Sequence, residues 1–365
     1  MSGTVKRDMV LKNNVTGVNE KMAHLYVLCG KNQTEVDELA CGDIGMIAKL
    51  SDTNTNDTLA LSSDVKYLPI HYPKPYYTQS MAPAAKGDEG KISQGIAKLL
   101  EEDLTLAYEN NAETKQMLIS GLGDMHLAVL VAKLKARFGV NIVLGEPKIA
   151  YREKITKRVQ VEGKDKKQSG GSGQYGHVKI TFAPGEAEGL TFTESVVGGA
   201  VPKNYFPAVE KGLLEAMQKG VAGFPVIHLA ADLFDGSYHD VDSNEISFKL
   251  AANLAYKECL KQASPVILEP VGDLTIVVPD SLVGDIMGDI NKRRGSVMGM
   301  DPCEKQGYTM IKAIAPKSEL VEYPIVLRAM TQGRGYFDFE VTGYEVVPGN
   351  ISAKIVEAYK NSQES

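Results

Sequence analysis

Residues able to do chemistry concentrate in a glycine- and lysine-rich stretch between Lys164 and His177. It contains four glycines and three lysines, and strand-like segments precede it at 158–162 and follow it at 177–182. A connection with almost no apolar side chains cannot help to build a core, so its composition needs a reason outside the fold. A flexible, cationic loop suits close contact with a phosphate-rich partner. The stretch therefore predicts a loop that meets nucleic acid.

Nucleotide chemistry is not predicted for this chain by itself. Residues 171–176 match the G-x-G-x-x-G pattern, but a dinucleotide site needs a helix directly after it, and here the residues alternate as in a strand. No G-x-x-x-x-G-K-[ST] motif occurs, so no loop of that kind holds a nucleoside triphosphate. We therefore expect no catalytic residue, cofactor or metal in this chain.

A second polar stretch, residues 238–242, places His239 between carboxylates. Metal binding or acid–base catalysis by His239, Asp240 and Asp242 is one interpretation, although no second cluster supplies further ligands. A polar turn that leads into a helix is another, with Asp242 as the cap and Glu245 completing a capping box. We favour an exposed, histidine-bearing loop that takes part in recognition.

Positive charge is local in this chain, whose net charge is −6. Eight Lys or Arg residues between 148 and 167 accompany only three acidic ones, so any nucleic-acid contact must come from such patches. A further group, Lys292, Arg293 and Arg294, precedes Gly295. Cations in the last turn of a helix followed by glycine explain this group without a partner, and an RNA-facing role explains it equally well.

The 365 residues are enough for several domains, and turn signals with a change of periodicity suggest four. Residues 1–68 read as short strands of a partial β-barrel, including one strand at 40–48. Residues 69–147 and 267–365 each fit a split βαβ order, the latter with strands over about 296–345 and a terminal helix. Residues 148–266 form a different, intervening α+β domain. The predicted fold class is multidomain α+β.

The cellular compartment is inferred from features that the sequence lacks. The four cysteines lie far apart with no C-x-x-C spacing, which fits a reducing cytosol. The first residues have no apolar signal-peptide core, and no window approaches eighteen uninterrupted apolar residues. We expect a cytoplasmic protein without membrane contact.

Six segments, in family order, resemble bacterial elongation factor G. They read ISGLGDMHL (119–127), PKIAYRE (147–153), QSGGSGQYGHV (168–178), FDGSYHDVDS (234–243), GDIMGDINKRRG (284–295) and TQGRG (331–335). The resemblance implies the end of the barrel-like domain II, a ferredoxin-like domain III, a domain IV like the second domain of ribosomal protein S5, and a ferredoxin-like domain V. It also implies a fragment that lacks the amino-terminal GTPase domain, its partner in cis, so GTP and Mg are expected only for the full-length parent.

In this family the factor promotes movement of tRNA and mRNA on the ribosome, and two loops at the tip of domain IV contact the tRNA–mRNA duplex in the A site. Carried over by motif, the tip residues are Ser169, Gly170, Gly171, Ser172, Gly173, Gln174, Tyr175, Gly176, His177, Gly236, Ser237, Tyr238, His239 and Asp240. Candidates for contact with rRNA are Lys166, Lys167, Lys292, Arg293 and Arg294. A ribosome-binding monomer is expected.

The chain departs from the family pattern at Ser172, where an arginine is usual, and at Asp103-Leu104-Thr105-Leu106. These differences keep two alternatives open: an elongation-factor-G-like paralogue, or a ribosome-protection protein, that binds the ribosome without translocase activity. The metal-dependent hydrolase that uses His239, Asp240 and Asp242 is the distant alternative.

Overall fold

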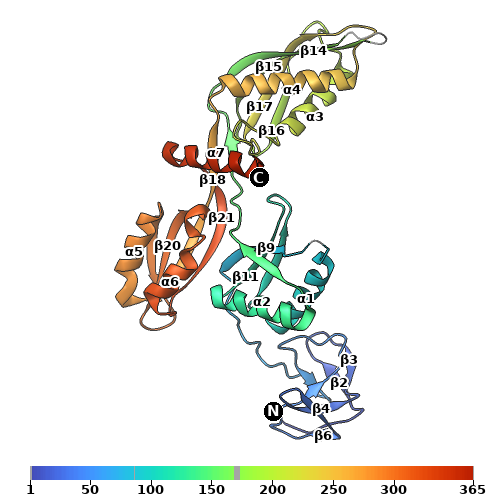
Figure 1. Ribbon diagram of the computed structural model, residues 1–365, viewed down its shortest axis with the longest axis vertical. Helices are drawn as coiled ribbons and strands as arrows, with labels where there is room; N and C mark the ends of the chain where they lie inside the picture. The colour runs from blue at the N-terminus through green and yellow to red at the C-terminus, as the bar shows by residue number, and fades with distance from the viewer. Residues whose placement is uncertain (1, 86, 168–172, 365) are drawn as a thin grey trace. The chain divides into compact units, whose positions relative to one another are not determined.

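In the computed structural model the chain folds into two compact units, one of residues 1–75, 81–109 and 119–143 and the other of residues 76–80, 110–118 and 144–365 (Figure 1). The structure describes residues 2–85, 87–167 and 173–364. Several separate sheets with helices on their faces make this a multidomain α+β protein, which confirms the predicted fold class.

The first residues form short strands: β1 (Val5–Lys6), β2 (Val10–Asn13), β3 (Asn19–Lys21), β4 (Leu25–Cys29), β5 (Asn32–Val36), β6 (Glu38–Leu39), β7 (Met46–Ile47) and β8 (Leu59–Ala60). They pair as three small sheets, β1-β6, β3-β2-β8 and β5-β4-β7, around a core of Leu11, Met22, Leu25 and Leu39. In the described residues these sheets do not close into a barrel, as the prediction of a partial barrel requires. The strand expected over 40–48 was wrong in extent, because only Met46 and Ile47 pair.

The next sheet contains β9 (Tyr77–Pro83), β10 (Ala107–Asn111), β11 (Gln116–Gly121) and β12 (Ile142–Gly145), with helices α1 (Glu89–Glu102) and α2 (Asp124–Phe138). Its strand order is β10-β11-β9-β12. Leu127, Leu130 and Leu134 recur every three or four residues, so one stripe of α2 is buried. Gly139, in the left-handed conformation with φ of 68°, ends that helix.

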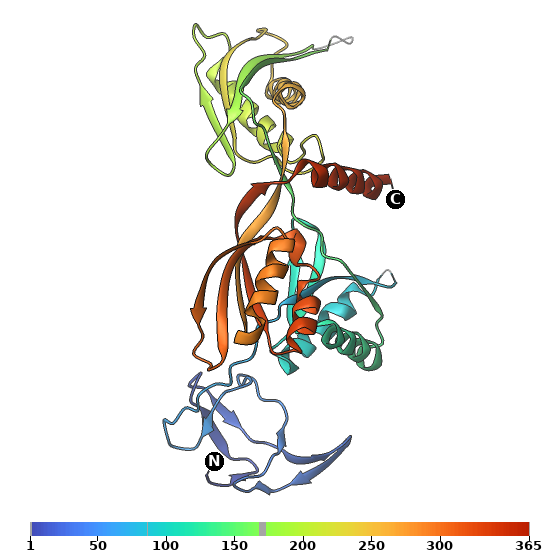
Figure 2. The ribbon, with the colours of Figure 1, turned by 90° about the vertical axis from the view of Figure 1, so that its left-hand side faces the viewer.

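The middle domain has a four-stranded sheet in the order β14-β15-β17-β16. Its elements are β14 (Val159–Lys167), β15 (Gln174–Pro184), β16 (Leu190–Glu194), α3 (Phe206–Ala216), β17 (Leu229–Ser237) and α4 (Glu245–Gln262). β16 runs parallel to β17, and the other pairs are antiparallel. Both helices pack on the same face of the sheet (Figure 2), over a core that includes Val178, Ile180, Phe182 and Phe248.

The last sheet repeats the earlier order. It consists of β18 (Val266–Pro279), β19 (Ser296–Pro302), β20 (Tyr308–Pro316) and β21 (Tyr336–Val346), with α5 (Val283–Lys292), α6 (Tyr323–Thr331) and a terminal helix α7 (Gly349–Glu364). Short β13 (Arg152–Lys154) pairs with the start of β18. In both sheets the order is second, third, first and fourth strand, which confirms two copies of a ferredoxin-like architecture.

Three further local predictions were wrong. Residues 296–345 are not all strand, because α6 begins at Tyr323 with Pro324 in its first turn. The N-cap of α4 is Asn244, whose side-chain oxygen accepts from the Ser247 N–H at 2.9 Å, and Asp242 lies outside the helix. Arg294 rather than Gly295 takes the left-handed conformation after α5, with φ of 58°.

Candidate nucleic-acid interface

The two ends of the glycine- and lysine-rich stretch lie in the paired strands β14 and β15. Their register pairs Lys164 with His177 and Lys166 with Tyr175, so these four side chains share one face of the sheet. Burial alternates along β14, and the opposite face lies against α4. Because α3 and α4 cover only that opposite face, the side chains of Lys164 and Lys166 are exposed.

Ser237, the last residue of β17, joins two rings on this face. Its hydroxyl lies 2.8 Å from the Tyr175 hydroxyl and 2.8 Å from Nδ1 of His177. A hydroxyl can donate one hydrogen bond and accept another, so Ser237 satisfies both neighbours at once. Lys164 adds a cation 5.6 Å from the centre of the Tyr175 ring. The rings are therefore held in place before any partner binds.

Asp242 and Ser243 fasten the His239 loop to the start of β15. The Asp242 carboxylate accepts from the Gly173 N–H at 3.1 Å, and the Asp242 carbonyl accepts from the Tyr175 N–H at 2.9 Å. The Ser243 hydroxyl donates to the Tyr175 carbonyl at 2.9 Å and accepts from the His239 N–H at 2.9 Å. The two predicted loops thus meet at one end of the sheet.

His239 is fixed through one ring nitrogen. Its Nδ1 accepts from the N–H groups of Val241 and Asp242, each at 3.3 Å, so the neutral ring carries its proton on Nε2. The Asp242 carboxylate is 3.5 Å from the same Nδ1 and would pair with it if that nitrogen were protonated. The side chain is 57% exposed, which leaves Nε2 able to donate to a partner.

The same sheet face carries one well-formed ion pair. Lys179 donates to Asp235 at 2.7 Å, which lowers the pKa of the Asp235 carboxyl and raises the pKa of the Lys179 ammonium. Both side chains are exposed enough for the pair to contribute little stability. Lys164 and Lys166 remain as the cations near the tip of this face, and Glu162, opposite Lys179 in the register, offsets part of their charge.

Two glycines of the predicted tip have packing roles. A Cβ at Gly176 would lie 2.4 Å from the Ser247 carbonyl oxygen in α4, and one at Gly236 would lie 2.3 Å from the His177 carbonyl oxygen. No side chain fits at either place without movement of the backbone. Sequence reasoning assigned both glycines to contact with tRNA, and the structure gives each a sufficient internal reason.

The remaining predicted tip residues fall into two groups, those outside the described residues and those exposed next to His239. Ser169, Gly170, Gly171 and Ser172 lie outside the described residues. Tyr238 is 45% exposed, and Asp240 is exposed beside it. Across the described ranges, no three His, Cys, Asp or Glu side chains come together as a metal would require. The hydrolase alternative therefore has no ligand cluster there, and Asp242 serves the Gly173 amide instead.

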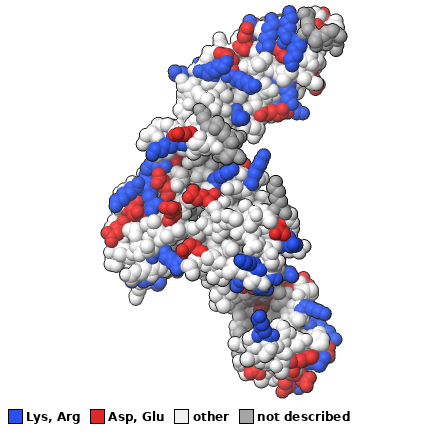
Figure 3. Space-filling view, viewed as in Figure 1, with Lys and Arg blue, Asp and Glu red and all other residues white. Residues whose placement is uncertain are grey.

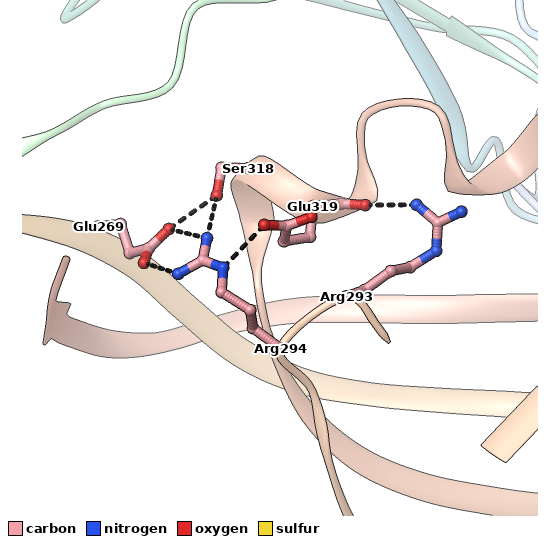
Figure 4. A network of polar contacts seen from close by, with 5 residues as sticks. All are labelled: Glu269, Arg293, Arg294, Ser318 and Glu319. Atoms are coloured by element: carbon pink, nitrogen blue, oxygen red, sulfur yellow. Dashed lines mark hydrogen bonds and ion pairs between the residues drawn. The ribbon is translucent and has the colours of Figure 1, made fainter. Parts of the chain in front are cut away.

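The arginines proposed for rRNA contact have internal partners (Figure 4). Arg294 donates two parallel hydrogen bonds to Glu269 and a third, at 2.7 Å, to Glu319. Arg293 donates to Asp289 at 2.7 Å and to the Glu319 carbonyl at 2.9 Å. Lys292 is exposed. Contact of these three residues with RNA stays a prediction, whereas the two arginines join the end of α5 to β18 and to the 3-10 turn at residues 317–320.

Sequence reasoning gave no role to Glu153, which is 1% exposed. Its carboxylate accepts from the N–H groups of Val221 and Ala222, both at 2.9 Å, and of Phe224 at 3.1 Å. These bonds fix the turn after α3. A glycine at position 220 was the one available signal, because a Cβ there would lie 2.4 Å from the Glu153 carboxyl carbon. The sequence around Gly220 does not point to Glu153, which lies far away in the chain.

We expect the Glu153 carboxyl to titrate above its ordinary pKa of 4.5, because burial raises the pKa more than the N–H bonds from Phe224, Ala222 and Val221 lower it. A raised pKa means that this group's contribution to stability is complete below pH 4.5 and is lost as the pH rises through the folded-state pKa. Carboxyl carbon NMR of Glu153 measures this directly, with Glu153→Gln to assign the signal. Titration below 4.5 would contradict the expectation.

Comparisons with known proteins identify the domains that carry this geometry. Three successive family models match: elongation factor G domain III at residues 72–146, elongation factor G domain IV at 147–264, and the elongation factor G C-terminus at 266–355. A curated relative, the elongation factor G-like protein of Thermotoga maritima, is 44% identical over 360 residues, which are 98% of this chain and 53% of that protein. A crystal structure from Thermus thermophilus is 34% identical with a TM-score of 0.79, over 98% of this chain and 54% of the other.

These matches define a set of translation-factor domains. The chain belongs to the elongation factor G family, of which it contains domains III and IV and the C-terminal domain. It spans about half the length of the relatives that it matches. No helix in the described part of the chain is long and apolar enough to cross a membrane.

Proposed function

We propose that this chain is the ribosome-binding part of a translational GTPase that promotes tRNA–mRNA translocation, and that the two fastened loops of its domain IV contact the tRNA–mRNA duplex. The longer protein would supply the domain that binds GTP and Mg. The observation that carries the proposal is the connection between the loops: Asp242 and Ser243 hold the His239 loop against Gly173 and Tyr175.

The chemistry of the two loops suits RNA of any sequence. Lys164 and Lys166 supply charge for phosphates, and Tyr175, Tyr238 and His239 supply rings and donors for exposed bases and riboses. Backbone and shape contacts carry no sequence information, and a factor that serves every codon needs that property.

We expect His239→Ala, in the complete protein, to slow single-round translocation about tenfold, which corresponds to loss of a contact of about 1.4 kcal/mol. Binding to ribosomes should change less, since the lysines remain. The matched control is His228→Ala, at the opposite end of β17, which should leave the rate unchanged. If the unaltered protein accelerates translocation, an unchanged rate for His239→Ala would show that the tip assignment is wrong.

A second candidate function is a ribosome-binding elongation-factor-G-like paralogue without translocase activity. The 44% identical relative is named an elongation factor G-like protein, which favours this candidate. The same assay separates the two, because a paralogue of this kind would bind ribosomes and leave translocation at its uncatalysed rate. The loop contacts proposed above apply to both.

A further inference from the structure

A groove on the helical side of domain IV lies outside the tip. It has a volume of about 780 Å³, and its walls come from the end of β14, the turn after α3 and the length of α4. This volume is within the range of sites that bind small molecules or single nucleotides. In the view of Figure 3, Lys and Arg side chains gather over this part of the domain.

Three lysines line the groove: Lys167, Lys219 and Lys257. Within the described ranges, none of them forms a salt bridge, whereas the acidic wall residue Glu215 pairs with Lys249 at 2.6 Å. Three ammonium groups without acidic partners make the groove attractive to anions.

The groove also contains a carboxylate that lacks a donor. Asp165 is 7% exposed, and its Oδ2 is buried without a hydrogen-bond partner. It lies opposite Gly176 in the β14–β15 register, on the strand face that α4 covers. A buried acceptor left unpaired is costly, so a ligand that brings a hydroxyl donor would relieve that cost. Leu254, which is 43% exposed, offers an apolar wall beside it.

The turn that carries Lys219 is held in position before binding. Glu153 accepts three backbone N–H bonds from residues 221–224, and the Gly220 N–H donates to the Phe224 carbonyl at 2.7 Å. A ligand that contacts Lys219 therefore meets a turn whose backbone is already ordered, which reduces the entropy lost on binding.

We propose that this groove binds a ribose–phosphate segment of RNA, with Lys219 and Lys257 on phosphates and a 2′-hydroxyl donating to Asp165. RNA is favoured over an acidic peptide because Lys167 follows Lys166 at the end of β14, so the groove begins one residue along the strand from the candidate interface, on the other face of the sheet. The inference rests on the proposed ribosome binding and adds to it a second RNA contact on the helical side of domain IV.

Photo-crosslinking on ribosomes tests the groove directly. A benzophenone amino acid at Leu254 reports on the groove, and one at the exposed Tyr238 reports on the tip. We expect the Leu254 probe to crosslink to RNA, with a yield at least about fivefold lower in Lys219→Glu/Lys257→Glu and unchanged in Lys203→Glu/Lys211→Glu, two lysines outside the groove.

A binding measurement with single strands provides the second readout. For a 12-nucleotide RNA, the magnitude of the slope of log affinity against log salt should fall by about 1.4 in Lys219→Ala/Lys257→Ala, about 0.7 for each phosphate contact on a single strand. Asp165→Leu should abolish any preference for RNA over DNA of the same sequence, because the 2′-hydroxyl then has no acceptor.

The outcomes distinguish the two proposals. A Leu254 crosslink to ribosomal protein alone, or a yield that the lysine variants do not change, overturns the groove assignment while a Tyr238 crosslink to RNA upholds the tip. If neither probe crosslinks and the chain does not sediment with ribosomes, the proposed function fails and the groove assignment fails with it.

Discussion

Replacing Arg294 by Ala is expected to lower the free energy of unfolding of residues 266–346 by about 3–5 kcal/mol. The Glu269 side chain is 3% exposed, and both of its oxygens accept hydrogen bonds from the Arg294 guanidinium. Ser318 also donates to Glu269, at 2.7 Å, but one hydroxyl cannot compensate a buried negative charge. The cost therefore comes from the carboxylate left behind more than from the lost pair.

Amide hydrogen exchange of β18 and β20 is the suitable measurement, because it reports the stability of one domain in a chain that has several. The matched control is Lys292→Ala, an exposed residue at the end of α5, two positions before Arg294, which should change the free energy by less than about 0.5 kcal/mol. Combining Arg294→Met with Glu269→Leu should restore most of the loss, since no charge then remains buried. A loss below about 1 kcal/mol for Arg294→Ala would contradict this account of the network.

Gly163→Ala is expected to destabilise domain IV by about 3 kcal/mol, the upper part of the usual range for overpacking. The added methyl group would lie 2.0 Å from the Ala251 carbonyl oxygen and 2.5 Å from the Ala255 backbone nitrogen. Both atoms belong to the backbone of α4, which cannot turn aside as a flexible side chain can. The helix must therefore move away from β14.

The control for Gly163→Ala is Gly189→Ala in the same domain, where an added Cβ meets nothing within 4 Å. Exchange protection of α4 should fall in the first variant and remain in the second. We also expect Gly163→Ala to weaken ribosome binding, because the groove along α4 and the loop before the helix both depend on its position. Wild-type protection of α4 in Gly163→Ala would show that the sheet can yield to the methyl group.

The spacing of apolar residues predicted a helix or strand wherever one stripe or face of that element is buried. The spacing of Leu127, Leu130 and Leu134 is that of a helix with one buried stripe, as α2 has, and the strand-like residues 177–182 predicted β15, because burial on one side follows from the geometry of each element. Repetition of these patterns was enough to predict two domains with a split βαβ order, and the family resemblance added that they are ferredoxin-like. α6 was missed because it has only nine residues and opens with Tyr-Pro-Ile-Val, which resembles a strand.

The candidate site was harder to predict because its hydrogen bonds join residues far apart in the chain. Asp242 has the local pattern of a helix cap, and nothing near it reveals the Gly173 amide that it accepts from, 69 positions away. Glu153 serves a turn about 70 positions distant. Gly295 looked like a helix terminator, but its missing side chain makes room for Ile290, and Arg294 takes the left-handed conformation instead.

The hydrogen bonds of Asp242 and Ser243 also affect how mutational data on this domain should be interpreted. Replacing Asp242 would remove the bond to the Gly173 N–H, and replacing Ser243 would remove the bonds to the Tyr175 carbonyl and the His239 N–H, so activity would fall even if neither side chain ever touched RNA. An alanine scan would then score scaffold positions as contact positions. Assigning contacts requires variants that leave this backbone scaffold intact, such as changes at the exposed Tyr238 and Lys166.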